Sequence, residues 1–332
     1  MTIKALLVDE TGAAIDLDQW REEREDIAAR LFSTLGRPPV VRNTRDIETL
    51  SEEELAAYAR HKIRYVVGDD DLISAYLLIP HQIEDPAPAV VAMHQIGPGK
   101  DEVAGLDGDP DFAYGHELAV RGYVVLVPDY LAFGERVYPG ADTFDSGPFY
   151  EQYPDWSMVG KNVEDSLSAV DVLHTLDVVD RDRIGVIGHS HGGHNAIFAA
   201  ALDDRIRACA SNCGMSVFSE EEERLAWCED EEGEYAYIPA LRPYFLQGQD
   251  PPFDLHEVAA LIAPRPWLNV SAYSDFAYGN QEFLAETGVH LYQVYELYEK
   301  TDAFAYFMHG NNHSFPRHAR DLAYGWLDRY LK

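Results

Sequence analysis

Lysine and cysteine are both scarce in this sequence. Only six of its 332 residues are lysine, and only three are cysteine. An odd number of cysteines cannot all pair into a disulfide framework, and the spacing of these three is not that of a closed zinc site. We therefore expect reduced thiols at Cys209, Cys213 and Cys228.

Basic charge of any kind is in short supply. The chain carries 26 lysines and arginines against 58 aspartates and glutamates, which gives a formal net charge of -32. Such a chain repels nucleic acid and anionic lipid over most of its surface, which argues against either as a partner. The charge does not decide the oligomeric state, and a homo-oligomer stays open.

Long apolar runs are also missing. No window approaches the roughly 18 apolar residues of a membrane span, and the N-terminal stretch has no apolar segment of signal-peptide length. We expect a cytoplasmic protein that does not cross a membrane.

The excess of carboxylates leads to a prediction about salt, because it resembles the composition of salt-adapted proteins. Like charges repel one another over a Debye length of about 10 Å at 0.1 M salt but only about 3 Å at 1 M. Added salt should therefore raise the melting temperature, which calorimetry between about 0.1 and 1 M sodium chloride can measure. A flat or falling melting temperature would mean that the charges are already balanced locally.

The remaining composition is that of a folded domain. Hydrophobic residues make up 46% of the chain and aromatic residues 12%, enough for a well-buried core in one large or two modest domains. We predict a helical N-terminal extension at residues 1–63, with a possible capping box at Ser51 and Glu54 opening its second helix. The first helix would place four apolar side chains on one face: Trp20, Ile27, Leu31 and Leu35.

From residue 64 to residue 332, short apolar strands alternate with amphipathic helices. An antiparallel hairpin is predicted at 64–68 and 72–79. Further strands are predicted at 89–93, 123–127, 183–187, 206–211, 267–272 and 304–308, and helices near 111–121, 161–177, 192–202, 255–261, 280–298 and 316–331. This alternation predicts an α/β fold with a mostly parallel, doubly wound sheet and an antiparallel N-terminal hairpin.

Two aromatic-rich stretches interrupt the alternation, at about residues 130–158 and 214–253. Long segments of this kind inside a domain are usually functional. We expect them to fold over the edge of the sheet as a lid or pocket wall, with Tyr153, Trp156 and Trp227 as candidate substrate-pocket residues. The alternative is that these aromatic side chains pack against the helical extension.

The most informative motif is Gly188-His-Ser190-His-Gly192. An apolar strand runs into it and a helix rich in small residues follows it, so Ser190 would stand on a strained strand-to-helix turn. Flanking glycines suit this turn because a Cβ there would clash with the neighbouring strand and helix. The helix N-terminus also favours a developing oxyanion, and we predict that Ser190 is a nucleophile.

A serine hydroxyl needs a base, which is expected later in the chain. His313 is the best candidate because it follows the strand at 304–308 through a short loop and precedes the last helix. Two rivals are His309, which ends that strand, and His318, which lies within the helix.

The base in turn needs a carboxylate to orient it. Asp275 lies just past the strand at 267–272, where catalytic residues gather in such sheets, and Asp302 or Asp254 could replace it. The order Ser190, Asp275, His313 is that of the α/β-hydrolase fold.

A cluster of histidines beside the motif raises the hypothesis of a metal site. His191 and His194 have helical i, i+3 spacing next to His189, but no carboxylate stands nearby in a ligand pattern. The segment Gly97–Lys100 also lacks the spacing of a phosphate-binding loop. We predict neither a metal nor a cofactor.

Five motifs in this order resemble those of the dienelactone-hydrolase-like α/β hydrolases, which include proteins classed as acetyl xylan esterases. The resemblance covers about residues 64–332. The motifs are Val90–Gln95, Gly122–Asp129 with Phe133–Arg136, Gly188–Gly192, Ala263–Pro266 and His313–Pro316.

The resemblance implies further site residues. In that family the oxyanion hole is made by backbone N–H groups after the nucleophile and after the third strand, which here are His191 and Gln95. Dienelactone hydrolases proper are shorter and carry a cysteine nucleophile, so Ser190 leaves the substrate open.

The expected function is hydrolysis of a small or medium carboxylic ester through a Ser190–Asp275–His313 triad. A serine peptidase of the prolyl-oligopeptidase type is one alternative, although the sequence has no propeller repeat. A non-catalytic binding protein of the same fold is the other alternative, and it would require a broken triad.

Overall fold

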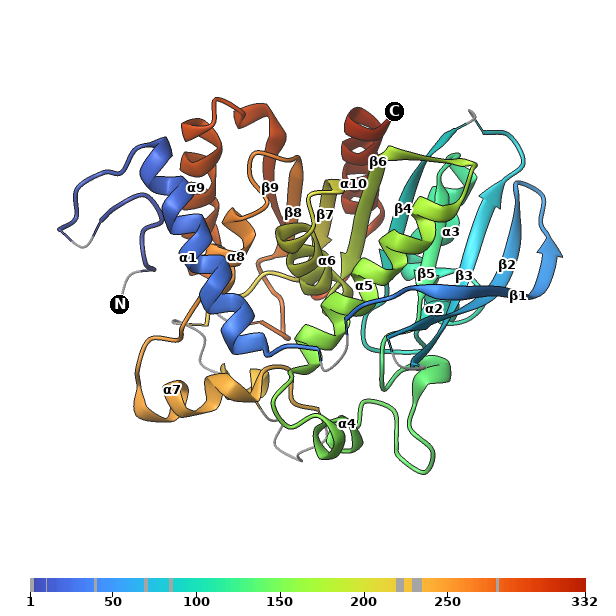
Figure 1. The fold of residues 1–332 in the computed structure, drawn as a ribbon. Coiled ribbons are helices and arrows are strands. Elements are labelled where there is room, and N and C mark those ends of the chain that lie inside the picture. Colours follow the sequence, from blue (N-terminus) through green and yellow to red (C-terminus); the bar gives the residue numbers. More distant parts are fainter. Residues whose placement is uncertain are drawn as a thin grey trace.

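Six apolar strands form the parallel part of the sheet (Figure 1). The computed structural model describes residues 3–9, 11–38, 41–68, 71–83, 86–218, 224–228, 235–278 and 281–332. Within these ranges the strands form one nine-stranded sheet in the order β1-β2-β3-β5-β4-β6-β7-β8-β9. The parallel strands are β4 (Ala87–Met93), β5 (Val124–Pro128), β6 (Val179–His189), β7 (Ile206–Asn212), β8 (Trp267–Ala272) and β9 (Phe304–His309). All seven residues of β4 are buried, as a sheet covered on both faces requires.

An antiparallel unit precedes the parallel part. Strands β1 (Arg45–Glu54), β2 (Tyr58–Val67) and β3 (Asp71–Pro80) pair in sequence, and β3 then pairs antiparallel with β5. The predicted hairpin is therefore confirmed, although residues 69 and 70 of its turn lie outside the described ranges. The predicted α/β-hydrolase arrangement of a mostly parallel sheet is confirmed as well.

One prediction about the N-terminal extension is wrong. Ser51 and Glu54 do not begin a second helix, because they lie in β1, and the expected boundary between residues 63 and 64 falls inside β2. Nearly all of β1 is exposed, so no apolar alternation marks it as a strand. Backbone pairing with β2 forms this strand, and cross-strand charge pairs accompany it: Glu48 lies 2.7 Å from Arg64, and Glu53 pairs with Arg60. The sequence pattern of a single segment does not show which residues of another strand will pair with it.

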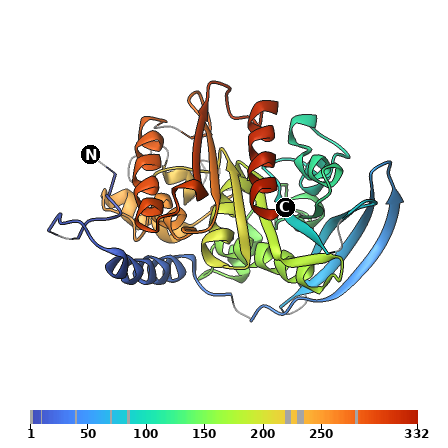
Figure 2. The same ribbon diagram turned by 90° about the horizontal axis from the view of Figure 1, so that it is seen from above.

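Helices cover both faces of the sheet. Helices α1 (Leu17–Leu35) and α5 (Met158–Thr175) lie on one side, together with α6 (His191–Leu202), α8 (Leu255–Ala260) and α9 (Gln281–Leu297) in the larger core cluster. Helices α3 (Tyr114–Val120) and α10 (Arg317–Leu331) pack into the second cluster on the other side (Figure 2). The first predicted helix is confirmed, since Trp20, Ile27, Leu31 and Leu35 are all buried. In the described part of the chain, no helix is both long and apolar enough to cross a membrane.

The two aromatic stretches follow strands β5 and β7, so both leave the carboxyl edge of the sheet. Their short helices α4 (Gly147–Gln152) and α7 (Arg242–Gln247) lie beyond one end of the sheet (Figure 1). The stretches pack on each other: the rings of Phe144 and Tyr235 stack at 4.3 Å, and the Tyr150 hydroxyl donates to the Ala236 carbonyl at 2.7 Å. Together they form one aromatic layer over that edge.

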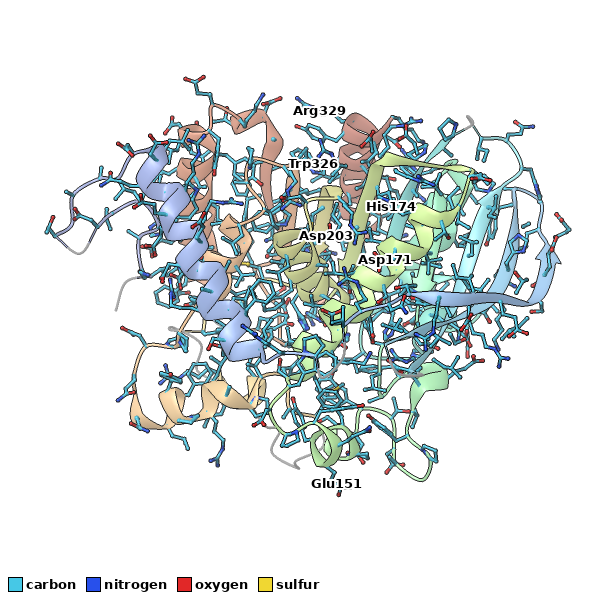
Figure 3. The ribbon with its side chains drawn as sticks, in the orientation of Figure 1. Glu151, Asp171, His174, Asp203, Trp326 and Arg329 are labelled. Atoms are coloured by element: carbon cyan, nitrogen blue, oxygen red, sulfur yellow. The ribbon has the colours of Figure 1, made fainter. Side chains whose placement is uncertain are left out.

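Arginines on the surface are shared between carboxylates. Arg205 lies 2.8 Å from Asp171 and 2.6 Å from Asp203, which joins α5 to the turn after α6. The two carboxylates, Asp171 and Asp203, are labelled in Figure 3. Arg42 also contacts Asp171 at 3.0 Å and ties the connection before β1 to the same helix. A chain with few basic residues thus uses one arginine to neutralise several carboxylates.

A buried ion network fastens the antiparallel unit to α5. Arg136 donates to Asp165 at 2.6 Å and to Asp71 at 2.8 Å, and Lys161 contacts both carboxylates. Burial alone would raise the pKa of the Asp71 carboxyl, but the charges of Arg136 and Lys161 lower it. Each of these groups therefore keeps its charge because groups of opposite charge contact it.

Removing one partner of this network should be costly. Arg136→Met would remove one of the two cations that contact Asp165, whose carboxylate is fully buried. Lys161 alone would then have to neutralise both Asp165 and Asp71. We expect a loss of about 3 kcal/mol in the free energy of unfolding, measured by urea denaturation. Arg317→Met is the control, because the Arg317–Asp321 pair is 66% and 50% exposed and should change the unfolding midpoint little. Equal effects of the two variants would contradict this account.

Candidate active site

Ser190 occupies a sharp turn between β6 and α6. Its backbone angles are φ 54° and ψ -118°, and its N–H donates to the Asn212 carbonyl at 2.9 Å. A Cβ at Gly188 would lie 2.1 Å from the Gly192 carbonyl oxygen, and one at Gly192 would lie 1.9 Å from that of Met93. The prediction that this turn requires glycines is confirmed, and the strained turn holds the serine above the sheet edge.

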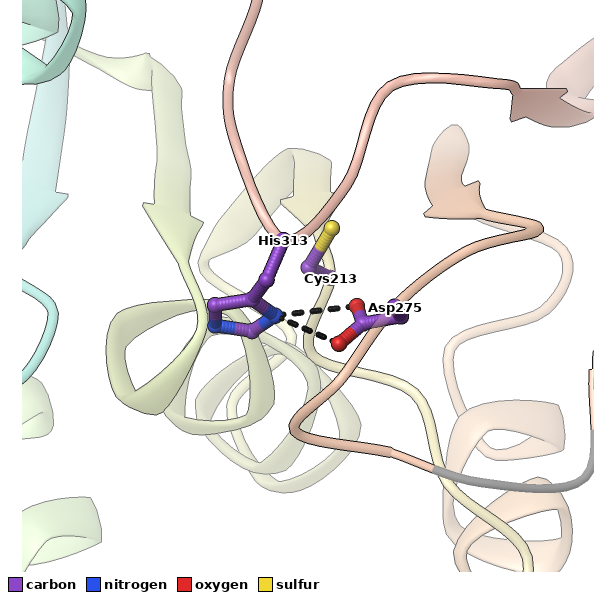
Figure 4. A group of neighbouring side chains, drawn as sticks. All are labelled: Cys213, Asp275 and His313. Atoms are coloured by element: carbon purple, nitrogen blue, oxygen red, sulfur yellow. Dashed lines mark hydrogen bonds and ion pairs between the residues drawn. The ribbon is translucent and has the colours of Figure 1, made fainter.

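The structure brings Ser190, His313 and Asp275 into one hydrogen-bonded chain. The Nε2 atom of His313 lies 2.8 Å from the Ser190 Oγ, and its Nδ1 atom lies 2.9 Å from each carboxylate oxygen of Asp275. Figure 4 shows the histidine and the aspartate facing each other from the loops after β9 and β8. All three side chains are largely buried, with 9% of Ser190 and 10% of the His313 side chain exposed.

Further hydrogen bonds hold the two loops in place. One oxygen of Asp275 accepts the Ala277 N–H at 2.8 Å, so the carboxylate organises its own loop. The Tyr273 N–H donates to the His309 carbonyl at 2.8 Å, and the Asn212 side chain donates to the Ser314 carbonyl at 3.0 Å. The histidine and its acid are thereby fixed relative to the strands that carry them.

The alternative candidates for the base and the acid make contacts outside the Ser190–His313–Asp275 chain. His309 accepts the Asn311 N–H at 3.1 Å and packs its ring 5.7 Å from that of His318. Asp254 is the N-cap of α8. Asp302 precedes β9 and pairs with Arg329 at 3.4 Å, at the end of that strand opposite to His313.

The two residues proposed for the oxyanion hole flank the serine. His191 is the first residue of α6, and Gln95 follows the end of β4, which pairs with β6. The Gln95 side chain is anchored, because it donates to Glu102 and accepts the Tyr114 hydroxyl at 3.2 Å. The neighbouring His94 is anchored as well, because its Nε2 atom accepts the Tyr130 N–H at 3.0 Å. These bonds therefore anchor the segment that follows β4.

The imidazoles around the turn are uncharged. Burial lowers the pKa of His189 and His191 well below the usual value and that of His194 to about 3. The ring of His189 packs 4.8 Å from that of His313. These rings therefore surround the site without adding positive charge.

A cysteine that the sequence reasoning missed stands beside the acid. The Sγ of Cys213, a carboxylate oxygen of Asp275 and the Nδ1 of His313 all lie within 4.8 Å of one another (Figure 4). Burial and then the Asp275 carboxylate raise the pKa of the thiol well above its usual value. The trio could hold a metal ion only by replacing the His313–Asp275 hydrogen bond. The one sequence signal for Cys213 was its place at the end of a parallel strand.

The three predicted pocket residues divide into two groups. Trp227 packs 5.1 Å from His194 and 6.5 Å from Tyr278, whose ring lies 5.8 Å from that of His313. It therefore belongs to the aromatic surroundings of the site.

The other two predicted pocket residues, Tyr153 and Trp156, pack against each other at 5.9 Å and against Phe149. The backbone of Trp156 also approaches Gly36 at the end of α1. Their role in a pocket stays a prediction.

Comparisons with known proteins agree with this architecture. Residues 139–297 match the family model described as glucuronyl esterase, fungi. The "Putative hydrolase YtaP" of Bacillus subtilis (strain 168) is 32% identical over 260 residues, which cover 76% of this chain and 81% of that protein.

Solved structures share the fold at low identity. A glucuronoyl esterase from Solibacter usitatus superposes with a TM-score of 0.77 at 20% identity, covering 99% of this chain and 97% of the other. A "putative acetyl xylan esterase" from Bacteroides fragilis superposes with a TM-score of 0.65 at 19% identity, covering 88% and 74%. The chain therefore belongs to the family of α/β hydrolases that contains YtaP.

Proposed function

We propose that this esterase uses Ser190, His313 and Asp275 as a catalytic triad that cleaves carboxylic esters through an acyl-enzyme. The observation that carries the proposal is the continuous chain of hydrogen bonds from the Ser190 hydroxyl through His313 to Asp275, at 2.8 and 2.9 Å. A geometry of this kind lets the imidazole accept the serine proton while its other nitrogen stays bound to the carboxylate.

Each residue then has one task in the reaction. The Ser190 oxygen attacks the ester carbonyl as its proton passes to His313 Nε2, and the same proton is given to the departing alcohol. Asp275 keeps the imidazole in the required tautomer and stabilises its charged form. The N–H groups of Gln95 and His191 hold the oxyanion, and a water molecule activated by His313 then releases the acid.

The substrate we propose is an ester of small or medium size, with a carbohydrate ester as the first class to test. Two relatives by fold are described as acting on glucuronoyl esters and on acetylated xylan. Neutral hydrogen-bonding groups and aromatic rings meet beside the nucleophile, including the Asn162 amide 3.1 Å from His191 and the ring of Trp227 near His194.

A panel of substrates tests the proposal. Chromogenic acetyl esters, longer acyl esters, a lactone, a methyl glucuronate ester and an aminoacyl amide should be compared, each with wild type and with the Ser190→Ala variant. We expect Ser190-dependent cleavage of esters, greatest for carbohydrate esters. Cleavage of the amide alone would favour the serine peptidase, and no cleavage of any substrate would favour the binding protein.

A further inference from the structure

An aromatic side chain stands exposed beside the triad histidine. Phe276 follows Asp275 directly, and its ring lies 5.4 Å from the ring of His313. It is 74% exposed, whereas His189, which packs on the same imidazole, is 1% exposed. Exposure alone is common for single apolar side chains, but Phe276 combines it with contact to the triad histidine.

The loop that carries this ring is held by the acid itself. Besides binding His313, the Oδ1 atom of Asp275 accepts the N–H of Ala277 at 2.8 Å and that of Tyr278 at 3.3 Å. On the other side, the Ser274 hydroxyl donates to the Gly310 carbonyl at 3.2 Å, which ties the loop to the segment that carries His313. Phe276 lies between these anchored residues, so the backbone that carries its ring is held beside His313.

The reaction chemistry relates the position of Phe276 to the alcohol half of the ester. The triad histidine gives its proton to the leaving alcohol, so the alkoxy oxygen must come within about 3 Å of His313 Nε2. The carbonyl oxygen points instead to the N–H groups proposed at Gln95 and His191. The first atoms of the alcohol are therefore held next to the imidazole, and the exposed ring of Phe276 packs on the same imidazole.

We propose that Phe276 is the binding subsite for the leaving alcohol and that it selects an alcohol carrying a ring. An aromatic face left in water gains most from a flat apolar partner, which is the C–H face of a sugar or an aryl ring. The proposal rests on the triad function proposed above and goes further, because it states which half of the ester the ring recognises.

The test varies the alcohol and keeps the acyl group constant. With the acyl group that wild type cleaves best, we would prepare the ethyl ester, the benzyl ester and the ester of a methyl pyranoside. Ethyl and benzyl alcohols have similar acidity, so a difference between them reports binding. Phe276→Ala should lower kcat/KM for the benzyl and pyranoside esters by about 10-fold or more, mainly through KM. The loss for the ethyl ester should be less than about twofold.

Two further variants complete the design. Phe276→Trp should restore the preference for ring-bearing alcohols, because it restores an aromatic face. Phe32→Ala is a matched control, since Phe32 is 51% exposed on α1 and should leave the selectivity unchanged. Equal losses for all three esters would overturn the proposal and indicate that the ring only supports His313. No loss for any ester would overturn it as well. In both cases, loss of activity in the Ser190→Ala variant would still support the triad as the catalyst. The two proposals can therefore fail separately.

Discussion

Replacing Ser190 by alanine should lower kcat by about 10⁴- to 10⁶-fold. The variant removes the atom that forms the acyl-enzyme, while the oxyanion donors and the binding surface remain. The fold should persist, because the strained turn is held by backbone contacts such as the Ser190 N–H bond to the Asn212 carbonyl, which alanine can also make. Steady-state hydrolysis of the best ester in the panel measures the effect, and a fluorophosphonate probe should label wild type alone.

The matched control for this variant is Ser168→Ala. Ser168 is also buried, but its hydroxyl donates to the Glu164 carbonyl within α5. That variant should keep its activity within about twofold and still react with the probe. Near-normal turnover by Ser190→Ala, with a melting temperature equal to that of wild type, would end the triad proposal.

Replacing Asp275 by asparagine should lower kcat by about 10⁴-fold. Both oxygens of Asp275 lie 2.9 Å from the His313 Nδ1 atom. A carboxylate can only accept a hydrogen bond, so it favours the tautomer that carries its proton on Nδ1. An amide at this position can donate to Nδ1 instead, which favours the tautomer with its proton on Nε2. That tautomer cannot accept the proton of Ser190.

Asp302→Asn is the control for this experiment, since Asp302 was the other acid that the sequence left open near β9. It contacts Arg329 and lies at the end of β9 opposite to His313, so we expect little change in kcat. A severe loss with Asp302→Asn, together with a loss below tenfold for Asp275→Asn, would transfer the role of the acid.

The nucleophile was accessible to sequence reasoning because its geometry is local. The strand, the serine and the helix are consecutive in the chain, and the contact that requires Gly188 is with Gly192 in the same turn. Only the contact that requires Gly192 reaches outside it, to Met93 at the end of β4. The apolar strands were accessible for a similar reason, since complete burial leaves an uninterrupted apolar pattern.

Strand β1 failed for the opposite reason. Its residues are polar and exposed, and helix and strand are equally compatible with such a segment until a partner is known. Backbone pairing with β2 decides the matter, and the charged partners of Glu48 and Glu53 also lie on that strand. Phe276 was passed over because exposure beside a catalytic group is a property of the folded surface.

By itself the sequence determined the α/β class, the serine that stands on the strained turn, and the chain order of the proposed nucleophile, acid and base. Tertiary structure alone decided which acid meets which histidine, and that Cys213 and Phe276 stand beside them. His313 lies 123 residues from Ser190 and 38 from Asp275, so no local pattern records their contact. The contact arises because parallel strands bring their carboxyl ends to one edge of the sheet, where loops that are distant in the chain become neighbours.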